Sequence, residues 1–554
     1  MRYDQSPPAR EEPACTVCSF RLTDGPRAAY RLPMRNHPLA STLLAAALVT
    51  SSASATVLRV GTLNGQAGDF ASIQEAVDAA SPGDWILIAP GDYHERGDYT
   101  HVLPGGDAAG AVLITKPNLH LRGLDRNKVI VDGTKPGAAP CDASPDAQDL
   151  GPLDGDSQPS GRNGIEVFEV DGVTIENLTA CNFLTGAHGG GNQIWWNGGD
   201  GTGTVNLNGY HGAYLSATTT VFLGEDAPGG EYGIFASNVH GPGLIEHTYA
   251  SNMRDAAYYV GACPDCNTRL TDAHAENSAL GYSGTNSGGH LIVEKSEWDE
   301  NTCGIVTNSQ NNDDAPSPQD GACPDNGRGP TGSHSCTLFR KNYIHDNNNP
   351  NVPRSGTAAF GPVGTGMVLA GGRHDTVVGN RIRNQGAWGV LVVPYLDTGP
   401  APPIAHCDGG RMDFIMPGWC FYDTFGQEVT GNRFKNVGFF GNVTNGDLAD
   451  LSYAHDPGNC WHGNRDASHK VSSAPDALEK THRRCGVQNA GEDPLSSDLS
   501  TQVICATELL GPCADAPGHH YPRATAVQLK ALPRQRTMRN PCKGVPSNPW
   551  CGKS

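Results

Sequence analysis

Short apolar runs, separated by glycine, asparagine and proline, recur along most of this chain. Runs such as Val112–Thr115, Leu119–Leu121 and Val129–Val131 have the length of β-strands rather than of helices. Pro117-Asn118 and Gly133 are typical turn residues between them. The pattern therefore predicts many short strands joined by tight turns.

One segment occurs twice, because residues 379–389 return as residues 431–441 with most positions identical or chemically similar. A unit this short cannot bury its apolar side alone, so it must stack on copies of itself. Two pairs of glycines, Gly281/Gly304 and Gly366/Gly389, are each 23 residues apart (304 − 281 and 389 − 366). We therefore expect a solenoid built from coils of about 23 residues.

Before the first strands, residues 70–80 predict a helix. Ser72 and Glu75 have the spacing of a capping box, and apolar residues follow at helical spacing. Pro82-Gly83 ends the helix, and the strand 85–88 follows. A single amphipathic helix in this position is suited to cover the open end of a solenoid.

The region 70–133 carries a Ser-Ile-Gln-Glu-Ala-Val helix, a Pro-Gly-Asp turn, an Ile-Ala-Pro-Gly-Asp-Tyr segment and a strand at 116–123. Together these features resemble the pectate-lyase-like superfamily of right-handed parallel β-helices. The resemblance implies an all-β, right-handed parallel β-helix (a solenoid) with an N-terminal amphipathic capping helix and long loop insertions. It is a likeness of fold alone, because the Asp-His motif of pectate lyases and the Gly-His-Gly motif of polygalacturonases are missing.

The periodicity also predicts the domain boundaries. The β-helix should span residues 56–460, and the Cys/Pro-rich residues 461–554 should form a C-terminal cap or tail. Insertions rich in Pro, Asp, Asn and Cys interrupt the coils and should be exposed loops, where function concentrates. These insertions are Gly186–Glu231, Asn311–His334, Asn347–Pro362 and Tyr395–Asp423.

The N-terminus has the pattern of an export signal. Met34-Arg35 precedes the apolar run Leu39–Val49, and Ala53-Ser54-Ala55 forms an A-x-A cleavage site. We expect translation to start at Met34, so that residues 1–33 are a mis-annotated leader and 34–55 a signal peptide. The alternative is a short N-terminal anchor with residues 1–33 translated. The apolar run is too short to span a bilayer, and we predict a secreted or periplasmic monomer.

The cysteines agree with export, because neighbouring cysteines in loop-like sequence are typical disulfide pairs in an oxidising compartment. Cys181 and Cys303 lie in strand-like runs and should be small buried residues. The close neighbours are Cys263/Cys266, Cys323/Cys336, Cys407/Cys420, Cys460/Cys485, Cys505/Cys513 and Cys542/Cys551.

The net charge of −19 argues against nucleic acid as a partner, since nucleic-acid binding depends on neutralising phosphates. The same charge repels anionic glycans in general. A uronic-acid polymer could still bind through a local Arg/Lys cluster or a bridging Ca²⁺, for which carboxylates are suitable ligands. Ca²⁺ is a possible cofactor, and no metal-ligand set is defined by the sequence.

Counting nine residues on from the spaced glycines gives His290, Asp313 and Asp375. If the coils keep register about 4.8 Å apart, these side chains should converge on one face and perform acid/base chemistry on a sugar. The alternative is that they are solvated turn residues. Their neighbours complete the candidate catalytic set: Asp314, Arg373 and His374, with Asn312 as a polar contact.

Aromatic side chains can stack on sugar rings, which makes Trp195, Trp196 and Tyr282 candidate substrate-binding residues. The tryptophans could equally pin a loop to a coil. Asn308 and Asn312 are candidate polar contacts to the same substrate. A second group of asparagines recurs at the turns and should be structural: Asn277, Asn301, Asn384 and Asn436.

Taken together, these patterns favour a carbohydrate-active protein that acts on an extracellular polysaccharide by lyase, epimerase or hydrolase chemistry at a loop-rich face. The alternative is a non-catalytic β-helix that binds a glycan or a surface. New reducing ends or unsaturated products would indicate an enzyme, whereas retention without products would indicate a binding protein.

Overall fold

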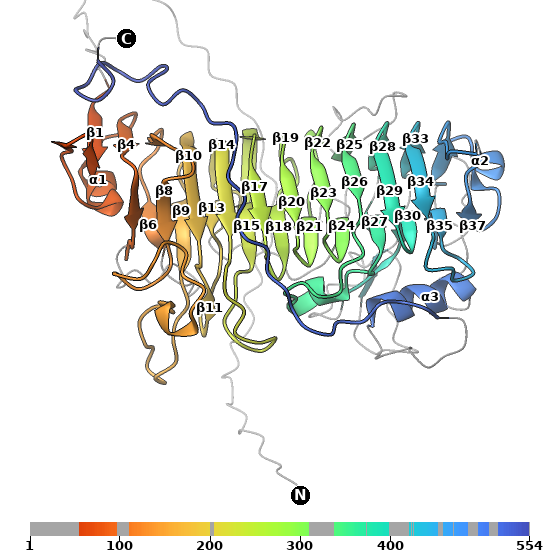
Figure 1. The fold of residues 1–554 in the computed structure, drawn as a ribbon. Helices are drawn as coiled ribbons and strands as arrows, with labels where there is room; N and C mark the ends of the chain where they lie inside the picture. Colours follow the sequence, from red (N-terminus) through yellow and green to blue (C-terminus); the bar gives the residue numbers. More distant parts are fainter. Residues whose placement is uncertain are drawn as a thin grey trace, which may run out of the picture. The chain divides into compact units, whose positions relative to one another are not determined.

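The computed structural model describes residues 55–96, 110–199, 204–309, 337–372, 374–397, 420–422, 424, 426–452, 458–468, 470–485, 497–508 and 519–552. Strands dominate these residues, and nearly all of them pair in parallel with strands of neighbouring coils. Each coil of the central region contributes three strands, one to each of three stacks (Figure 1).

The first two stacks join into one 20-stranded sheet, because β10 and β14 each run through both. The first stack contains β1 (Val57–Val60), β4 (Trp85–Ile88), β7 (His120–Gly123), β10 (Val173–Cys181), β14 (Leu207–Thr218), β16 (Val239–Glu246), β19 (Thr268–Thr271), β22 (Leu291–Glu294), β25 (Thr337–Arg340), β28 (Thr376–Val378), β33 (Glu428–Thr430) and β36 (Cys460–His462). The second stack contains β5 (Gly91–Tyr93), β8 (Val129–Asp132), the later halves of β10 and β14, β17 (Tyr249–Ser251), β20 (His274–Glu276), β23 (Glu297–Asp299), β26 (Tyr343–His345), β29 (Arg381–Gln385) and β34 (Arg433–Val437).

The third stack is an 11-stranded parallel sheet. Its strands are β6 (Gly110–Ile114), β9 (Asn163–Phe168), β13 (Ile194–Asn197), β15 (Tyr232–Ser237), β18 (Ala256–Gly261), β21 (Leu280–Thr285), β24 (Cys303–Asn308), β27 (Thr365–Ala370), β30 (Trp388–Val393), β35 (Gly446–Asp450) and β37 (Ser473–Ala474). Short antiparallel pairs lie outside the stacks: β2 (Thr62–Leu63) with β3 (Gln66–Ala67), β11 (Thr185–Gly186) with β12 (Gly189–Gly190), and β31 (Tyr395–Asp397) with β32 (Cys420–Tyr422).

The glycine spacing marks true coil equivalence in the third stack. The register of β21, β24, β27 and β30 aligns Gly281, Gly304, Gly366 and Gly389. A Cβ atom added to Gly281 would lie 2.5 Å from the carbonyl oxygen of Gly304, so a side chain there would collide with the next coil. The predicted coil of about 23 residues is thus present wherever no insertion intervenes.

The duplicated segment matches the coil repeat only in its first half. Arg381 pairs with Arg433, and Ile382 pairs with Phe434. In the third stack, however, Trp388 pairs with Gly446 rather than with Phe440. The later copy therefore has a longer turn, and Phe440 leaves the strand register to pack on Gly386.

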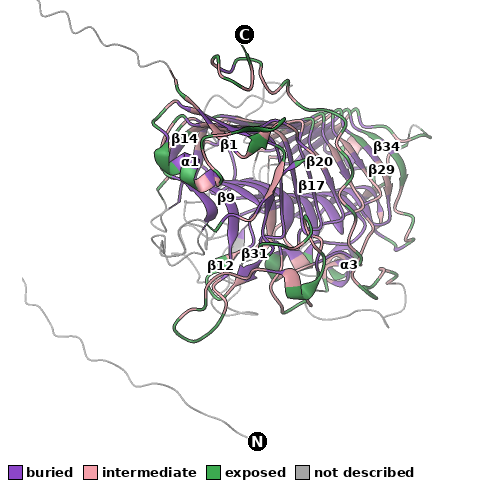
Figure 2. Ribbon diagram, turned by 60° about the vertical axis from the view of Figure 1, so that its left-hand side comes forward, coloured by how far each residue is buried: buried purple, intermediate pink, exposed green. Residues whose placement is uncertain are grey.

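Buried apolar side chains of the stacked strands form one continuous core inside the coils, and most strand residues are coloured as buried in Figure 2. In the first stack these are Ile245, Leu270, Val293 and Phe339, all with 0% exposure. The turn after the first stack is short, and buried asparagines bridge successive coils there. Because each side-chain amide pairs with backbone of the neighbouring coils, the interior turn has few unsatisfied polar groups.

Helix α1 (Ile73–Ala79) forms where the sequence predicts it, against β1, β4 and β6. The Ser72 hydroxyl accepts from the Glu75 amide, as expected, while the Glu95 carboxylate accepts from the Ile73 amide at 2.6 Å. At the other end, Lys116 Nζ donates to the carbonyl of Val77. Both charges suit the helix dipole. A role of α1 in covering the end of the coils stays a prediction.

The C-terminal segment 519–552 follows helix α3 (Asp498–Thr507) and runs back along the coils toward β1 (Figure 1). Four asparagines on the coils hold it, and each amide donates to the carbonyl and accepts from the N–H of one segment residue. The pairs are Asn442 with His520, Asn252 with Lys530, Asn127 with Gln535, and Asn177 with Arg539. Val545 then packs on Leu87 and Leu124.

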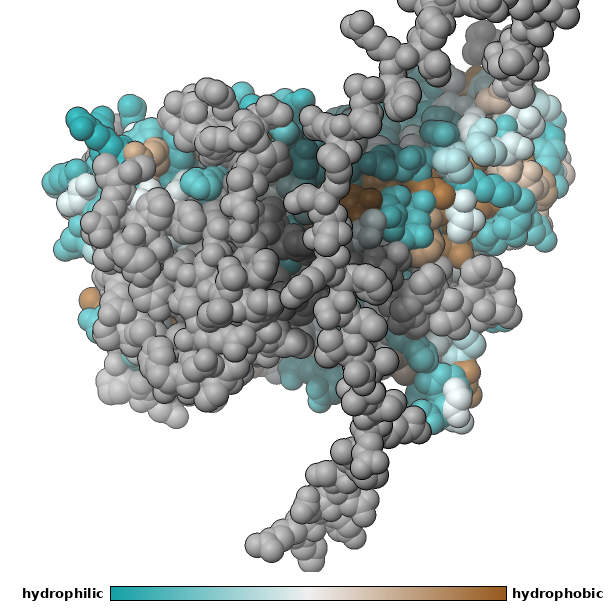
Figure 3. All heavy atoms as spheres, turned by 180° about the vertical axis from the view of Figure 1, so that it is seen from behind, coloured by the Kyte–Doolittle hydropathy of each residue, from teal (hydrophilic) through white to brown (hydrophobic). Residues whose placement is uncertain are grey.

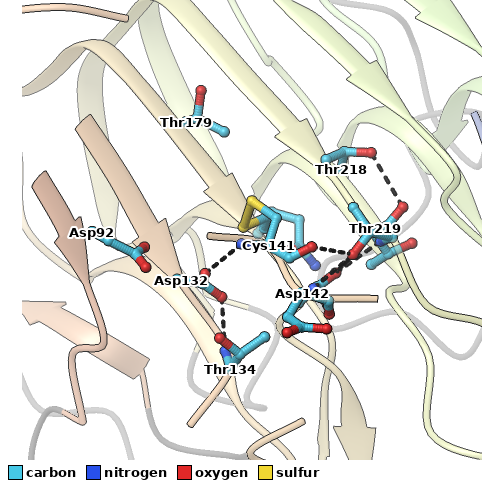
Figure 4. The surroundings of a disulfide bond; sticks show 12 residues. Asp92, Asp132, Thr134, Cys141, Asp142, Thr179, Thr218 and Thr219 are labelled. Atoms are coloured by element: carbon cyan, nitrogen blue, oxygen red, sulfur yellow. Dashed lines mark hydrogen bonds between the residues drawn. A yellow bond between two sulfur atoms is a disulfide. The ribbon is translucent and has the colours of Figure 1, made fainter. Parts of the chain in front are cut away.

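Disulfides join Cys263 to Cys266, Cys460 to Cys485 and Cys542 to Cys551, as the sequence predicts. Cys303 is buried and free, which was also expected. The prediction for Cys181 was wrong, because it forms a disulfide with Cys141 across 40 residues (Figure 4). Cys323, Cys336, Cys407 and Cys513 lie outside the described residues, as does the side chain of Cys420.

Among the described helices, none is both long enough and apolar enough to cross a membrane. Seen from behind, the described surface is mainly hydrophilic, with a smaller patch of hydrophobic residues (Figure 3).

Candidate functional site

An aromatic row lies on the outward side of the third stack. Trp195, Phe235 and Tyr259 are in register on β13, β15 and β18. The Trp195 ring stacks on Phe235 at 4.9 Å between centroids, and Trp195 Nε1 donates to Ser237 Oγ. Trp195 is 9% exposed, so only an edge of this candidate sugar-stacking residue reaches the surface.

Trp196 and Tyr282 instead point into the coils and are fully buried. Trp196 lies 5.5 Å from Tyr210, and the Tyr282 hydroxyl donates to the carbonyl of Val260. In this conformation both rings belong to the core and cannot stack on a sugar. For Trp196, packing against the coil is therefore the interpretation that fits its position.

Asn308 ends β24 and is 8% exposed. Its side-chain oxygen accepts from Thr285 Oγ1 on the preceding coil at 2.8 Å. Asn308 therefore holds two coils together at the edge where the third stack leads into the insertion. Asn312, Asp313, Asp314 and Arg373 lie outside the described residues.

His290 and His374 occupy equivalent positions two coils apart, just before strands β22 and β28 of the first stack. Both have left-handed backbone conformations, with φ of +51° and +56°. His290 Nδ1 lies 2.8 Å from Asp265 Oδ1. The turn after β27 is one residue shorter than the turn after β21 (375 − 370 against 291 − 285), so Asp375 is equivalent to Leu291 rather than to His290.

Asp375 consequently points into the interior and is 1% exposed. Its Oδ1 accepts from the Thr337 amide at 3.2 Å, and its own amide donates to Gln427 Oε1 at 2.9 Å. Burial raises the pKa of Asp375 to about 7. The structure thus separates Asp375 from the surface on which His290 lies.

A second candidate surface, which the sequence analysis missed, lies on the outward side of the second stack. We call it the polar face and define it by the outward residues of β20, β23, β26, β29 and β34. One row runs His274, Glu297, Tyr343, Arg381, Arg433. The neighbouring row runs Glu276, Asp299, His345, Arg383, Lys435.

Two histidine–carboxylate pairs occupy adjacent coils of the polar face. His274 Nε2 lies 2.7 Å from Asp299 Oδ1, and His345 Nε2 lies 3.1 Å from Glu297 Oε1. His345 Nδ1 also lies 2.7 Å from Asp346 Oδ2. Each pair joins a residue of one row to a residue of the other row on the next coil. The four titratable side chains therefore form one continuous network.

Burial lowers the pKa of His274, but Asp299 and the neighbouring carboxylates raise it more, so the net shift is upward. The same balance, with Glu297 and Asp346 as partners, raises the pKa of His345. The hydrogen bond from His345 in turn lowers the pKa of Glu297. Protonated imidazoles held beside carboxylates are suited to donate a proton.

The C-terminal segment borders the polar face. Lys530 Nζ pairs with Glu300 and lies 2.5 Å from Glu276 Oε2, and the Tyr249 hydroxyl donates to Glu276 Oε1 at 2.6 Å. On the coils before β20, the outward positions of the second stack include Ser216 and Ser251, which are fully buried. The segment crosses these coils (Figure 1), where Lys530 and Arg539 are hydrogen-bonded to Asn252 and Asn177. The polar face begins where that crossing ends.

The sequence does contain a signal for the polar face. Each of its strands contains a triplet with an apolar residue between two polar ones, such as His274-Ala275-Glu276 and Arg381-Ile382-Arg383. Alternation over three residues is too short to identify a strand by itself. Only the coil register turns five such triplets into two continuous rows.

Described carboxylates and histidines come close enough to share a cation at several places. Asp92, His94 and Asp132 place ligand atoms within 4.8 Å of one another, and burial followed by the charge of Asp132 raises the pKa of Asp92 to about 6. Asp132 also accepts from the Cys141 amide beside the disulfide (Figure 4). This arrangement does not identify a particular ion, and Ca²⁺ binding stays a prediction.

A separate pocket of about 460 Å³ lies beside the β11–β12 hairpin. Pro159, Pro228 and Asp226 line it together with Glu231 and Arg254. The last two form an ion pair at 2.6 Å and so neutralise one another. Its volume suits a small ligand, but its charges do not select one.

No protein-family model matches this chain, and no curated protein matches it. Solved structures do match. A mannuronic-acid-specific family 6 lyase from human gut microbiota is 12% identical, over 83% of this chain and 96% of the lyase, with a TM-score of 0.35. The endo-xylogalacturonan hydrolase of Aspergillus tubingensis is 12% identical, over 79% and 99%, with a TM-score of 0.36.

The Dettilon tailspike protein is 14% identical over 71% of this chain, with a TM-score of 0.35, and the chain spans 58% of its length. Matches at these identities and TM-scores support no inference about activity. The fold rests on the strands themselves, which stack coil upon coil in three parallel arrays. This chain is a right-handed parallel β-helix protein, which is the fold that its resemblance to the pectate-lyase-like superfamily implied.

Proposed function

We propose that this protein acts on an extracellular polysaccharide. The observation that carries the proposal is the polar face, where two histidine–carboxylate pairs lie on adjacent coils and are followed by cations. Successive coils are about 4.8 Å apart, so a polymer lying across them would meet two outward side chains of the polar face at each coil. A solenoid with such a surface is suited to a chain-like ligand.

Lyase, epimerase and hydrolase reactions on sugars all require proton transfer. In the proposed reaction, His345 and His274 supply protons, because their pKa values are raised. Glu297 and Asp299 orient the imidazoles and stabilise their charged forms. Arg381 and Arg383, one coil further, would hold an anionic group of the substrate.

The residues predicted from glycine spacing remain a second part of the proposal. His290 and His374 line the turn that leads from the third to the first stack. With Asp313, Asp314 and Arg373 from the neighbouring sequence, they would form an acid/base group on that side. Loss of product formation in Asp313→Asn, with an unchanged His345→Gln variant, would assign the reaction to this turn instead of the polar face.

The proposed setting is extracellular or periplasmic, with the protein as a monomer. Four disulfides within the described residues fit an oxidising compartment. The signal-peptide pattern of residues 34–55 supports export. N-terminal sequencing of exported protein should begin at Thr56, and a start before that residue would contradict the predicted cleavage site.

A panel of polysaccharides tests the proposal, with new reducing ends and unsaturated uronates as readouts. The His345→Gln variant should lower turnover by about 100-fold, the size of a lost acid/base group. His211→Gln is the matched control, because His211 pairs with Glu246 at 3.2 Å on the first stack, outside the polar face. Equal losses in both variants, or no turnover of any glycan, would contradict an acid/base role of the polar face.

One observation favours the alternative of a non-catalytic glycan- or surface-binding protein. Each histidine of the polar face is already paired with a carboxylate, as in a structural surface network. Retention of a glycan by the wild-type protein without any product would select this alternative. Repeating the panel with a chelator would test whether Ca²⁺ takes part in either case.

A further inference from the structure

The polar face changes sign along its length, from carboxylates and histidines to cations. Arg381 and Arg383 on β29 are followed by Arg433 and Lys435 on β34. Arg465 continues the first row, because it pairs with Arg433 in a parallel bridge. We call these five residues the cation ladder.

The cation ladder is open to solvent. Arg381, Arg433, Lys435 and Arg465 are exposed, and Arg383 is partly exposed. The guanidinium of Arg381 lies 4.9 Å from the centre of the Tyr343 ring, a cation–π contact that orients it. Across the described part of the chain, none of the five forms an ion pair with a carboxylate.

Five neighbouring cations without acidic partners are unusual in this chain, which has 39 Lys and Arg residues against 58 Asp and Glu. Like charges opposite one another on neighbouring strands are destabilising. No described carboxylate lies within ion-pair distance of these five cations, although carboxylates are abundant in the chain. An external anion would offset it, because each rung offers donors that match carboxylate or sulfate groups.

We propose that the cation ladder is a binding site for a linear anionic polysaccharide, with its acidic groups placed on successive rungs. Rungs about 4.8 Å apart, over three coils, suit a chain with regularly repeated charges. The strongly acidic remainder of the protein disfavours nucleic acid, whose dense charge would be repelled beyond the ladder. This inference deepens the proposed function by naming its substrate class, and it leads the polymer from the ladder toward His345.

Binding is measured by affinity electrophoresis and titration calorimetry with polygalacturonate, heparin and neutral dextran. Wild-type protein should bind at least one anionic polymer, and not dextran, with an affinity that falls as salt is added. Polygalacturonate and heparin separate carboxylated from sulfated ligands. Tighter binding of dextran, or of single-stranded DNA, than of either anionic polysaccharide would overturn the proposal.

The double variant Arg433→Ser/Lys435→Ser removes both exposed cations of one rung and should weaken polymer binding by about tenfold. The matched control Arg483→Ser/Arg484→Ser removes the same charge from exposed residues outside the ladder. Both proteins should keep the circular dichroism and the melting temperature of the wild type within about 2 °C. Unchanged binding in the ladder variant, or equal weakening in the control, would overturn the assignment.

The two proposals fail in different ways. If His345→Gln keeps polymer binding and the wild type forms no product, the ladder stands and the catalytic proposal fails. If the ladder variant turns over a glycan as fast as the wild type at low substrate concentration, the ladder is not the substrate site.

Discussion

At the scale of single residues, the interior of the coils contains a carboxyl group that titrates far from its ordinary range. Asp375 is buried among the hydroxyl-bearing side chains of Thr307 and Thr337, and its pKa is about 7 because burial penalises the charged form. In the unfolded chain the pKa of this carboxyl group would lie near its ordinary value of 3.8. The folded state therefore binds a proton between these two pH values, and stability falls as pH rises through this window.

The variant Asp375→Asn should remove this dependence. Asparagine keeps an oxygen acceptor for the Thr337 amide but has no charge to bury. We expect the free energy of unfolding to rise by about 2–4 kcal/mol near pH 8 and to change little near pH 4. Denaturant titrations at both pH values measure this change in the free energy of unfolding. An equal change at the two values would show that packing, rather than ionisation, dominates.

His345 offers a second test at this scale. Burial lowers its pKa, while Glu297 and Asp346 raise it more. Glu297→Gln removes one of the two negative charges beside His345, so the pKa of His345 should fall. If the proposed activity needs protonated His345, the pH above which activity declines should fall with it. NMR titration of the imidazole measures the shift. Glu246→Gln serves as the control, and a fall of the same size there would exclude a local cause.

At the scale of elements, a buried asparagine ladder holds the turn between the first and second stacks. The backbone N–H groups of Asn342, Asn380 and Asn432 each donate to the side-chain oxygen of the asparagine on the next coil, at 2.9 Å. Asn380 Nδ2 also donates to the carbonyl of Phe339. The side chain of Asn380 thus satisfies two backbone groups of the preceding coil, the N–H of Asn342 and the carbonyl of Phe339.

Asn380→Ala should destabilise the fold by about 2–4 kcal/mol, since it leaves the Asn342 amide and the Phe339 carbonyl without partners. Thermal unfolding measures the loss. Asn436→Gly is the comparison, because Asn436 lies in an exposed pair and has a φ of +57° that glycine adopts readily. If Asn436→Gly lowers the stability of the fold as much as Asn380→Ala does, the buried asparagines do not contribute more to stability than the exposed ones.

The elements also show how far the sequence alone could lead. Gly281 and Gly304 fixed the coil length correctly, because a backbone that approaches the next coil excludes a side chain. The same count placed His290 and Asp375 together, and it failed because one turn is a residue shorter. The scaffold role of Asn277 and Asn384 agrees with their positive φ angles. The polar face could not be predicted from the sequence, because its strands are too short to recognise there and only their register in the structure aligns them.

At the scale of the whole described unit, the C-terminal segment links coils that otherwise contact only their neighbours. Solenoids without such a segment behave nearly as one-dimensional arrays, in which the ends can open independently. Here Lys530, Gln535 and Arg539 are hydrogen-bonded to three different coils. Arg539 also pairs with Glu176 at 2.7 Å, so polar contacts reinforce the backbone hydrogen bonds.

Deletion of residues 523–554 should therefore weaken the early coils more than the late ones. The deletion removes the partners of Asn127 and Asn177 and uncovers Leu87. We expect a lower melting temperature and faster amide exchange in β4, β7 and β10 than in β27 and β30, measured by hydrogen exchange. If the deletion speeds amide exchange equally in all coils, or does not change it in any coil, the segment does not couple the coils.

The returning segment has a consequence for the timing of folding. Arg122 on an early strand donates to the carbonyl of Lys543, 421 residues later in the chain. Coils can form one after another during synthesis, but Leu87 and Leu124 reach their final burial only when the last residues arrive. A ribosome that stops short of Val545 would leave an almost complete solenoid with its oldest part still uncovered.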